Sequence, residues 1–147
     1  GIENIFWPGR LQTIQKNPLV IFDVAHNNDS IIALCNYISS LTNKRKLHLL
    51  ISIQKTKEIY KSIDEIKRVF DSIICTQIND RMFTVDQLAA QFEPFNNIKI
   101  RLFSETLIDN IINSMDDRDV LVIAGSHYWG EYIEKKYKNL FVVNKLN

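Results

Sequence analysis

The chain has little glycine, little cysteine and no long apolar run, and each shortage excludes a class of protein. Its 147 residues include 4 glycines and 2 cysteines. Neither Gly-x-Gly-x-x-Gly nor Gly-x-x-x-x-Gly-Lys-Ser/Thr occurs, so the usual loops that cradle phosphates are missing from this sequence. No apolar run approaches the ~20 residues that span a bilayer, and no signal peptide is visible at the start.

Charge and cysteine usage point to a globular protein of the cytoplasm. The net charge is +1, so there is no electrostatic argument for binding nucleic acid or an anionic membrane. A hydrophobic content of 46% with 24% charged residues is typical of a soluble domain with a real core. Cys35 and Cys75 are isolated in apolar patterns, which predicts reduced core thiols rather than a disulfide or a zinc site.

Strand-like and helix-like runs alternate, which favours a single α/β domain over residues 1–147. The expected strands span residues 19–23, 47–51, 72–76, 98–102, 120–124 and 140–143. Three of the expected helices span residues 30–41 (capped by Asn28 or Asp29), 56–71 and 128–137. A short helix capped by Thr84 and a helix with an apolar stripe capped by Ser104 are also expected. This alternation predicts a mainly parallel sheet of about six strands with helices on both faces.

Two polar clusters lie about a dozen residues apart near the start of the chain. Arg10 follows Pro8-Gly9, and its rigid guanidinium suits phosphate oxygens. The run from Asp23 to Asn27 ends the first expected strand, where open α/β sheets bind ligands. Asp23 there can accept ribose hydroxyls, and His26 can face the same crevice. Alternatively, Asp23 and Asn27 are turn and capping residues and Arg10 is a surface arginine.

A third candidate site follows the most apolar strand. Gly125-Ser126-His127-Tyr128 comes directly after residues 120–124 and opens the last expected helix. Glycine allows close backbone approach, and helix amides with a serine hydroxyl make an anion site. Ser126 is equally well suited to cap the helix without any ligand.

Together these motifs resemble the carboxy-terminal domain of folylpolyglutamate synthase and dihydrofolate synthase, in the Mur-type amide ligase superfamily. That family carries Pro-Gly-Arg, then Asp-x-Ala-His-Asn at the end of the next strand, in the order and spacing found here. It has Gly-Ser-x-Tyr or Gly-Ser-x-His where this chain has 125–128. It usually has Asp-Lys-Asp where this chain has Thr56-Lys57-Glu58, and often Pro at the position of Asn28. The missing acid at Thr56 leaves open the orientation of Lys57 or the identity of the substrate.

The resemblance runs from Pro8 to about Lys136 and implies a Rossmann-like fold and a set of site residues. Lys57 is expected to pair with a carboxylate of the glutamate substrate, unless it is an ordinary solvated lysine. No catalytic base and no metal ligand is implied within this chain. The implied residues are ATP-binding Arg10, Asp23 and His26, glutamate-binding His26, Lys57 and Ser126, and supporting Asn27 and Gly125.

The implied activity is that of an ATP-dependent ligase which adds L-glutamate to dihydropteroate or a folate through an acyl phosphate. ATP, Mg²⁺ and the folate are expected to bind an amino-terminal domain in cis that is absent from this chain, which alone is expected to be inactive. Members of this branch are expected to be monomers. An alternative is a stand-alone Rossmann-like module that binds a nucleotide or amino acid without catalysis. A weaker one is a metal-dependent hydrolase using Asp23, His26 and His127.

Overall fold

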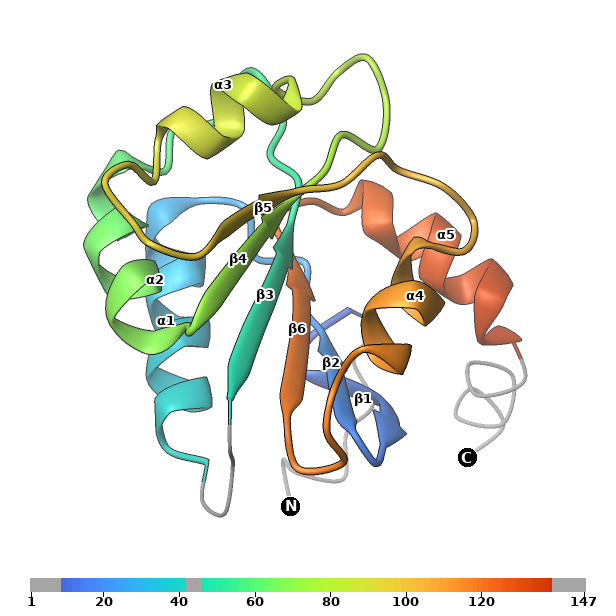
Figure 1. Cartoon of the computed structure of the whole chain (residues 1–147). Coiled ribbons are helices and arrows are strands. Elements are labelled where there is room, and N and C mark those ends of the chain that lie inside the picture. Colours follow the sequence, from blue (N-terminus) through green and yellow to red (C-terminus); the bar gives the residue numbers. More distant parts are fainter. Residues whose placement is uncertain (1–8, 42–45, 139–147) are drawn as a thin grey trace.

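The computed structural model describes residues 9–41 and 46–138, which form a layered α/β domain (Figure 1). The elements are β1 (Gln12–Lys16), β2 (Leu19–Phe22), α1 (Asn28–Ser39), β3 (Leu47–Ile51), a 3₁₀ turn (Tyr60–Ser62), α2 (Ile63–Val69), β4 (Ser72–Cys75), α3 (Val85–Ala90), β5 (Ile98–Ile100), α4 (Leu107–Asn113), β6 (Val120–Ala124) and α5 (Tyr128–Lys136).

The strands form one sheet in the order β1-β2-β6-β3-β4-β5. Among the described strands, only β1 is antiparallel to its neighbour, and the other pairs are parallel. Strand β6, the last of the described strands along the chain, lies between β2 and β3 and is buried throughout. The predicted fold, a mainly parallel sheet of about six strands, is therefore confirmed. The carboxyl ends of β2, β6 and β3 lie next to one another, where such sheets bind ligands.

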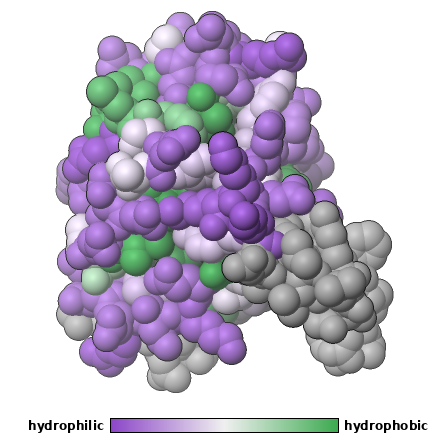
Figure 2. Space-filling view, turned by 90° about the vertical axis from the view of Figure 1, so that its right-hand side faces the viewer, coloured by the Kyte–Doolittle hydropathy of each residue, from purple (hydrophilic) through white to green (hydrophobic). Residues whose placement is uncertain are grey.

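Helices cover both faces of the sheet, as the alternation of runs predicted. On one face α1, α2 and α3 pack against alternate strand residues such as Leu49 and Val122. On the other face α4 and α5 pack against Leu50 and Leu121 (Figure 1). The outer side of α4 and α5 is mainly hydrophilic with small separate apolar areas (Figure 2). No helix within the described ranges is long and apolar enough to cross a membrane.

One strand was not predicted. Residues Gln12–Lys16 form β1, which pairs with β2 across a register shift between Thr13 and Gln15. Because β1 is an edge strand with one face toward solvent, its sequence is mostly polar. The predicted strand at 140–143 lies outside the described residues.

Three predicted helix starts were wrong. Residues 56–59 are not helical, because the N–H groups of Lys55 and Lys57 are used in loop hydrogen bonds to Arg81 and Gln54; the helical segment begins as the 3₁₀ turn. The cap of α1 is Asn27, not Asn28 or Asp29. Helix α4 begins after Thr106 rather than at Ser104, and Thr106 makes no side-chain cap hydrogen bond. The Thr84 cap of α3 is confirmed.

Candidate functional site

The loop after β2 is organised around the buried carboxylate of Asp23. Asp23 is 8% exposed, and its oxygens accept hydrogen bonds from the N–H groups of Leu11 (Oδ2, 3.0 Å) and Ala25 (Oδ1, 2.7 Å). Burial raises the pKa of Asp23 above its usual value, although the two N–H groups and the charge of Arg10 act in the opposite direction. The carboxylate therefore fastens the Arg10–Leu11 turn to the end of β2.

Arg10 follows a turn residue that must be glycine. Gly9 has a φ of +78°, and a Cβ there would lie 2.6 Å from Cγ1 of Val24. The carbonyl of Gly9 accepts a hydrogen bond from the N–H of Val24 (2.6 Å), which holds the turn against the β2 loop. The exposed Arg10 and the buried Asp23 both line a cavity of about 160 Å³. The two predicted ATP-binding residues thus share one cavity at the carboxyl end of β2.

His26 is half-buried in the same loop, with a defined ring orientation. Its Nδ1 lies 2.9 Å from the carbonyl oxygen of Val24. Because a carbonyl oxygen can only accept, Nδ1 carries the proton, and Nε2 is the ring nitrogen available to a ligand. Asn27 then caps α1: its Oδ1 accepts from the N–H of Ser30 (2.9 Å), and Ser30 Oγ accepts from the N–H of Asn27 (3.2 Å). The predicted supporting residue Asn27 is a helix cap that fixes the loop carrying His26.

The turn after β6 crosses the neighbouring loops at very close range. Gly125 has a φ of +109°, and its N–H donates to the carbonyl of Ala25 in the β2 loop (2.8 Å). A Cβ on Gly125 would clash with the backbone oxygen of Ser52, directly after β3. Ser126 is 1% exposed, and its Oγ accepts from the N–H of Tyr128 (3.1 Å). Ser126 therefore supports the first turn of α5, and its binding of a ligand stays a prediction.

Lys57 lies in the loop after β3, in a turn held from two sides. Its N–H donates to the carbonyl of Gln54 (2.9 Å), and the N–H of Lys55 donates to the carbonyl of Arg81 in the loop after β4 (2.8 Å). An isolated bridge between Gln54 and Met82 adds a further connection. Within the described ranges no hydrogen bond or ion pair engages the half-buried Lys57 ammonium. Its backbone is fixed while its charge is open to a partner.

Arg81 was assigned no role from the sequence, and the structure places it against the start of α5. Its guanidinium carbon is 6.0 Å from the centre of the Tyr128 ring, within the range of a cation–π contact. The rings of His127 and Tyr128 are 4.4 Å apart. The sequence signal was an arginine in the loop after a buried strand, following Asn79. Arg81 therefore adds a further positive charge to the edge that carries Lys57.

The predicted residues converge on one edge of the sheet without forming a closed cluster. Gly125 connects the loop of Asp23 and His26, through Ala25, to the loop that follows β3. In the described part of the chain, however, no hydrogen bond or ion pair links His26, Lys57 and Ser126 to one another. Nor do the described residues contain a group of three His, Cys, Asp or Glu side chains that could hold a metal ion. The arrangement is suited to binding and positioning.

Comparison with known proteins agrees with the fold. Residues 9–127 match the family described as Mur ligase, glutamate ligase domain. A relative from Buchnera aphidicola (subsp. Baizongia pistaciae), named dihydrofolate synthase/folylpolyglutamate synthase, is 27% identical over 99% of this chain and 33% of its own length. Among solved structures, Escherichia coli FolC in complex with ADP superimposes with a TM-score of 0.76 at 23% identity, covering 95% of this chain and 33% of that chain.

A second structural neighbour is a bifunctional folylpolyglutamate synthase/dihydrofolate synthase with Mn, AMPPNP and L-glutamate bound. It superimposes with a TM-score of 0.77 at 23% identity, covering 89% of this chain and 32% of that chain. The chain therefore spans about a third of the length of the relatives it matches. The match over residues 9–127, together with the fold, shows that this chain belongs to the Mur ligase family, as a glutamate ligase domain.

Proposed function

We propose that this chain is the carboxy-terminal, glutamate-binding domain of an ATP-dependent ligase that adds L-glutamate to dihydropteroate or a folate. The observation that carries the proposal is the crossing at Gly125, which gathers the loops after β2, β6 and β3 at one edge. Those loops carry the motif residues Asp23, His26, Lys57 and Ser126. One structural neighbour is named with ADP bound and another with L-glutamate bound. In this proposal the edge contributes to binding ligands of these two kinds.

In this proposal the residues act by positioning and by charge. Arg10 contacts ATP phosphates and Asp23 the ribose hydroxyls, since the two side chains share a cavity. Lys57 pairs with a carboxylate of glutamate, and its open ammonium is suited to this. Ser126 orients the same substrate from the start of α5. His26 lies between the two sets, with Nε2 directed to either ligand.

The chemistry itself requires an activated acyl group. ATP with Mg²⁺, held by an amino-terminal domain in cis, supplies a phosphoryl group to the carboxylate of the acceptor. The neutral amine of glutamate attacks the acyl carbon, the C–N bond forms, inorganic phosphate leaves with its bonding electrons, and the nitrogen loses one proton to solvent to give the amide. This chain lowers the barrier by holding the amine in line with that carbon, since positioning alone accounts for large rate factors. The domain by itself is inactive and is active only with its partner domain.

The test replaces the matching third of the E. coli relative with this chain and measures ATP-dependent incorporation of labelled glutamate. Asp23→Asn and Lys57→Ala are each expected to reduce kcat/KM at least tenfold, because each removes a charged contact to a substrate. Lys61→Ala, an exposed lysine in the 3₁₀ turn, is the matched control and is expected to leave the rate unchanged. Activity that survives both substitutions would refute the assigned site.

A second candidate is a stand-alone module that binds a nucleotide or amino acid without catalysis. The sequence favours it in one respect, because the chain contains no glycine-rich phosphate loop. The two candidates separate in the same chimera. If it is folded and binds L-glutamate through Lys57 but transfers none, the module is the correct function.

A further inference from the structure

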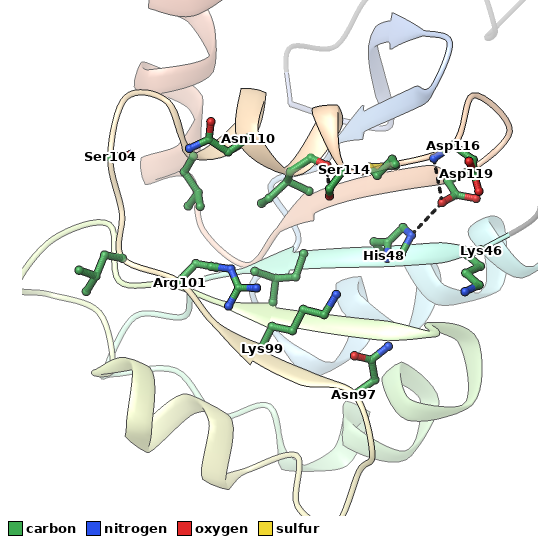
Figure 3. Close-up of a pocket in the computed structure, with 15 residues that line it drawn as sticks. Lys46, His48, Asn97, Lys99, Arg101, Ser104, Asn110, Ser114, Asp116 and Asp119 are labelled. Carbon is green, nitrogen blue, oxygen red and sulfur yellow. Dashed lines mark hydrogen bonds and ion pairs between the residues drawn. The ribbon is translucent and has the colours of Figure 1, made fainter.

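A second cavity lies away from the candidate site, between β5 and α4 (Figure 3). Its volume is about 530 Å³, a size typical of small-molecule sites. It exists because α4 and α5 pack on this face of the sheet over β2, β6, β3 and Ile74 of β4 and leave the same face of β5 uncovered. None of the side chains of β5 belongs to the core beneath α4 and α5. The cavity is therefore an open groove along the last strand of the sheet.

The groove combines an apolar floor with a polar wall. Ile74 of β4 and Leu107 and Ile111 of α4 form apolar lining. Asn110 of α4 and Ser114, the residue that caps the end of α4, are exposed and line the opposite wall with groups that can hydrogen-bond (Figure 3). A ligand that fits has to present both methylene groups and hydrogen-bonding groups.

The β5 side of the groove is positively charged. Lys99 and Arg101 are two residues apart on an extended backbone, so their side chains emerge on the same face at a spacing of about 6.6 Å. Both are exposed and directed into the groove (Figure 3). In the described part of the chain no acidic side chain pairs with either; the guanidinium of Arg101 donates only to the neighbouring carbonyl of Ile100 (2.9 Å). The two cations are available to an anionic ligand.

The far end of the groove contains two carboxylates, those of Asp116 and Asp119. His48 Nε2 lies 3.2 Å from Oδ2 of Asp119 (Figure 3). On its other side, His48 Nδ1 lies 2.6 Å from Oγ of Ser72. Burial opposes ionisation of Asp119, but the hydrogen bonds from His48 and from backbone N–H groups lower its pKa. With the exposed Asp116 beside them, this end combines the cation Lys46 with two carboxylates, whereas the part lined by Lys99 and Arg101 contains cations and no carboxylate.

That stretch opens at the same edge as the candidate site. The chain that leaves the groove after Arg101 reaches α5 at once: the Phe103 ring is 5.9 Å from that of Trp129 and 5.2 Å from that of Tyr132. The Tyr132 hydroxyl donates to the carbonyl of Glu105 (2.6 Å). The segment that follows the groove is therefore anchored on α5, the helix that Ser126 precedes.

We infer that this groove binds an extended oligoglutamate chain of the kind that repeated glutamate addition produces; the inference rests on the proposed function. In a γ-linked chain each free α-carboxylate is attached directly to the main chain, so the carboxylates repeat at a fixed spacing that can match Lys99 and Arg101. The two methylenes between them lie on the apolar floor. In an α-linked chain the carboxylates end flexible side chains, and ordering them costs more entropy.

The experiment measures binding of γ-linked tetraglutamate to the 147-residue chain by calorimetry at low ionic strength. The Lys99→Ala/Arg101→Ala double variant is expected to bind on the order of tenfold more weakly, because two exposed charge contacts are lost. The Lys16→Ala/Lys61→Ala double variant loses the same charge from exposed sites outside the groove and is expected to bind like the native chain. Equal melting temperatures confirm that all proteins are folded.

Free L-glutamate and α-linked tetraglutamate are the comparison ligands. The inference is overturned if γ-linked tetraglutamate does not bind, if the groove variant binds it unchanged, or if the α-linked peptide binds as tightly. These results are independent of ligase activity. A chimera that transfers glutamate, combined with a groove that ignores the peptide, refutes this inference alone. A chimera without transfer refutes the proposed function.

Discussion

Replacing Gly125 with alanine tests whether the candidate site depends on one close backbone crossing. The glycine has a φ of +109°, a region that L-residues with side chains rarely adopt. An added Cβ would overlap the backbone oxygen of Ser52 and lie 3.0 Å from side-chain carbons of Ile51 and Ile53. A backbone oxygen cannot rotate away as the end of a flexible side chain can. The loop after β3 must therefore shift, or the turn after β6 must.

The expected cost follows from two contributions. Holding alanine at a positive φ costs of order 1–3 kcal/mol. Displacing the Ser52 carbonyl, or losing the 2.8 Å hydrogen bond from Gly125 to Ala25, adds on the order of 1 kcal/mol. Gly125→Ala is therefore expected to lower the free energy of unfolding by about 2–4 kcal/mol. Since domains of this size are stable by roughly 5–15 kcal/mol, most of the variant remains folded.

Urea unfolding followed by circular dichroism measures this change, and the chain provides a matched control. Gly130 lies inside α5, where a Cβ would meet only Cζ of Phe22 at an ordinary 3.9 Å. Because glycine is unfavourable in a helix interior, Gly130→Ala is expected to raise stability by about 0.5–1 kcal/mol. The same substitution thus acts in opposite directions at two sites five residues apart. A loss below about 1 kcal/mol at Gly125 would refute the crossing as described.

Four further predictions concern protonation, thiol reactivity and capping. The pKa of Asp23 is raised above 3.8, so the folded state binds this proton more tightly than the unfolded state does. The free energy of unfolding therefore falls as the pH rises from 3.8 to the raised value, and Asp23→Asn is expected to remove that slope. The pKa of Asp119 is lowered, so its contribution is present above pH 3.8 and lost as the pH falls below it; unfolding of Asp119→Asn across this range is expected to lack the acid-side loss. Burial raises the pKa of Cys35 and Cys75 to about 12. Neither thiol is therefore expected to react with a thiol reagent at pH 8 until urea unfolds the chain, and rapid labelling of the native state would contradict this. Thr84→Ala removes the side-chain cap of α3 and is expected to cost about 1 kcal/mol in urea unfolding, whereas no change would mean that the cap contributes nothing.

The parallel part of the sheet was predictable because its strands are buried on both sides. Leu47–Ile51 and Val120–Ala124 are continuous apolar runs, and both strands have the predicted bounds. Gln12–Lys16 was not recognised, since an edge strand with one solvated face has no such run. Its position follows from pairing with β2, and pairing is a long-range property that a local pattern does not contain.

The location of the candidate site was predictable, whereas its internal contacts were not. Polar residues after apolar strands identified the carboxyl edge, and Asp23, His26 and Ser126 lie there. The sequence could not show that the Asp23 carboxylate is used by two backbone N–H groups, since one of them comes from Leu11 in a separate turn. It also could not reveal the contact of Arg81 with Tyr128, which forms only when the loops after β4 and β6 meet.

The position of β6 has a consequence for synthesis of the chain. Before residue 120 leaves the ribosome, β1 and β2 can pair and β3 to β5 can pair, but no strand connects the two groups. Each group then has an open edge with which β6 pairs later, and open edges of this kind promote association between chains. When β6 enters, it separates β2 from β3 by two strand spacings, about 9.6 Å. The distance between the Asp23 and Lys57 loops is thus set last, by the strand that ends at Ala124.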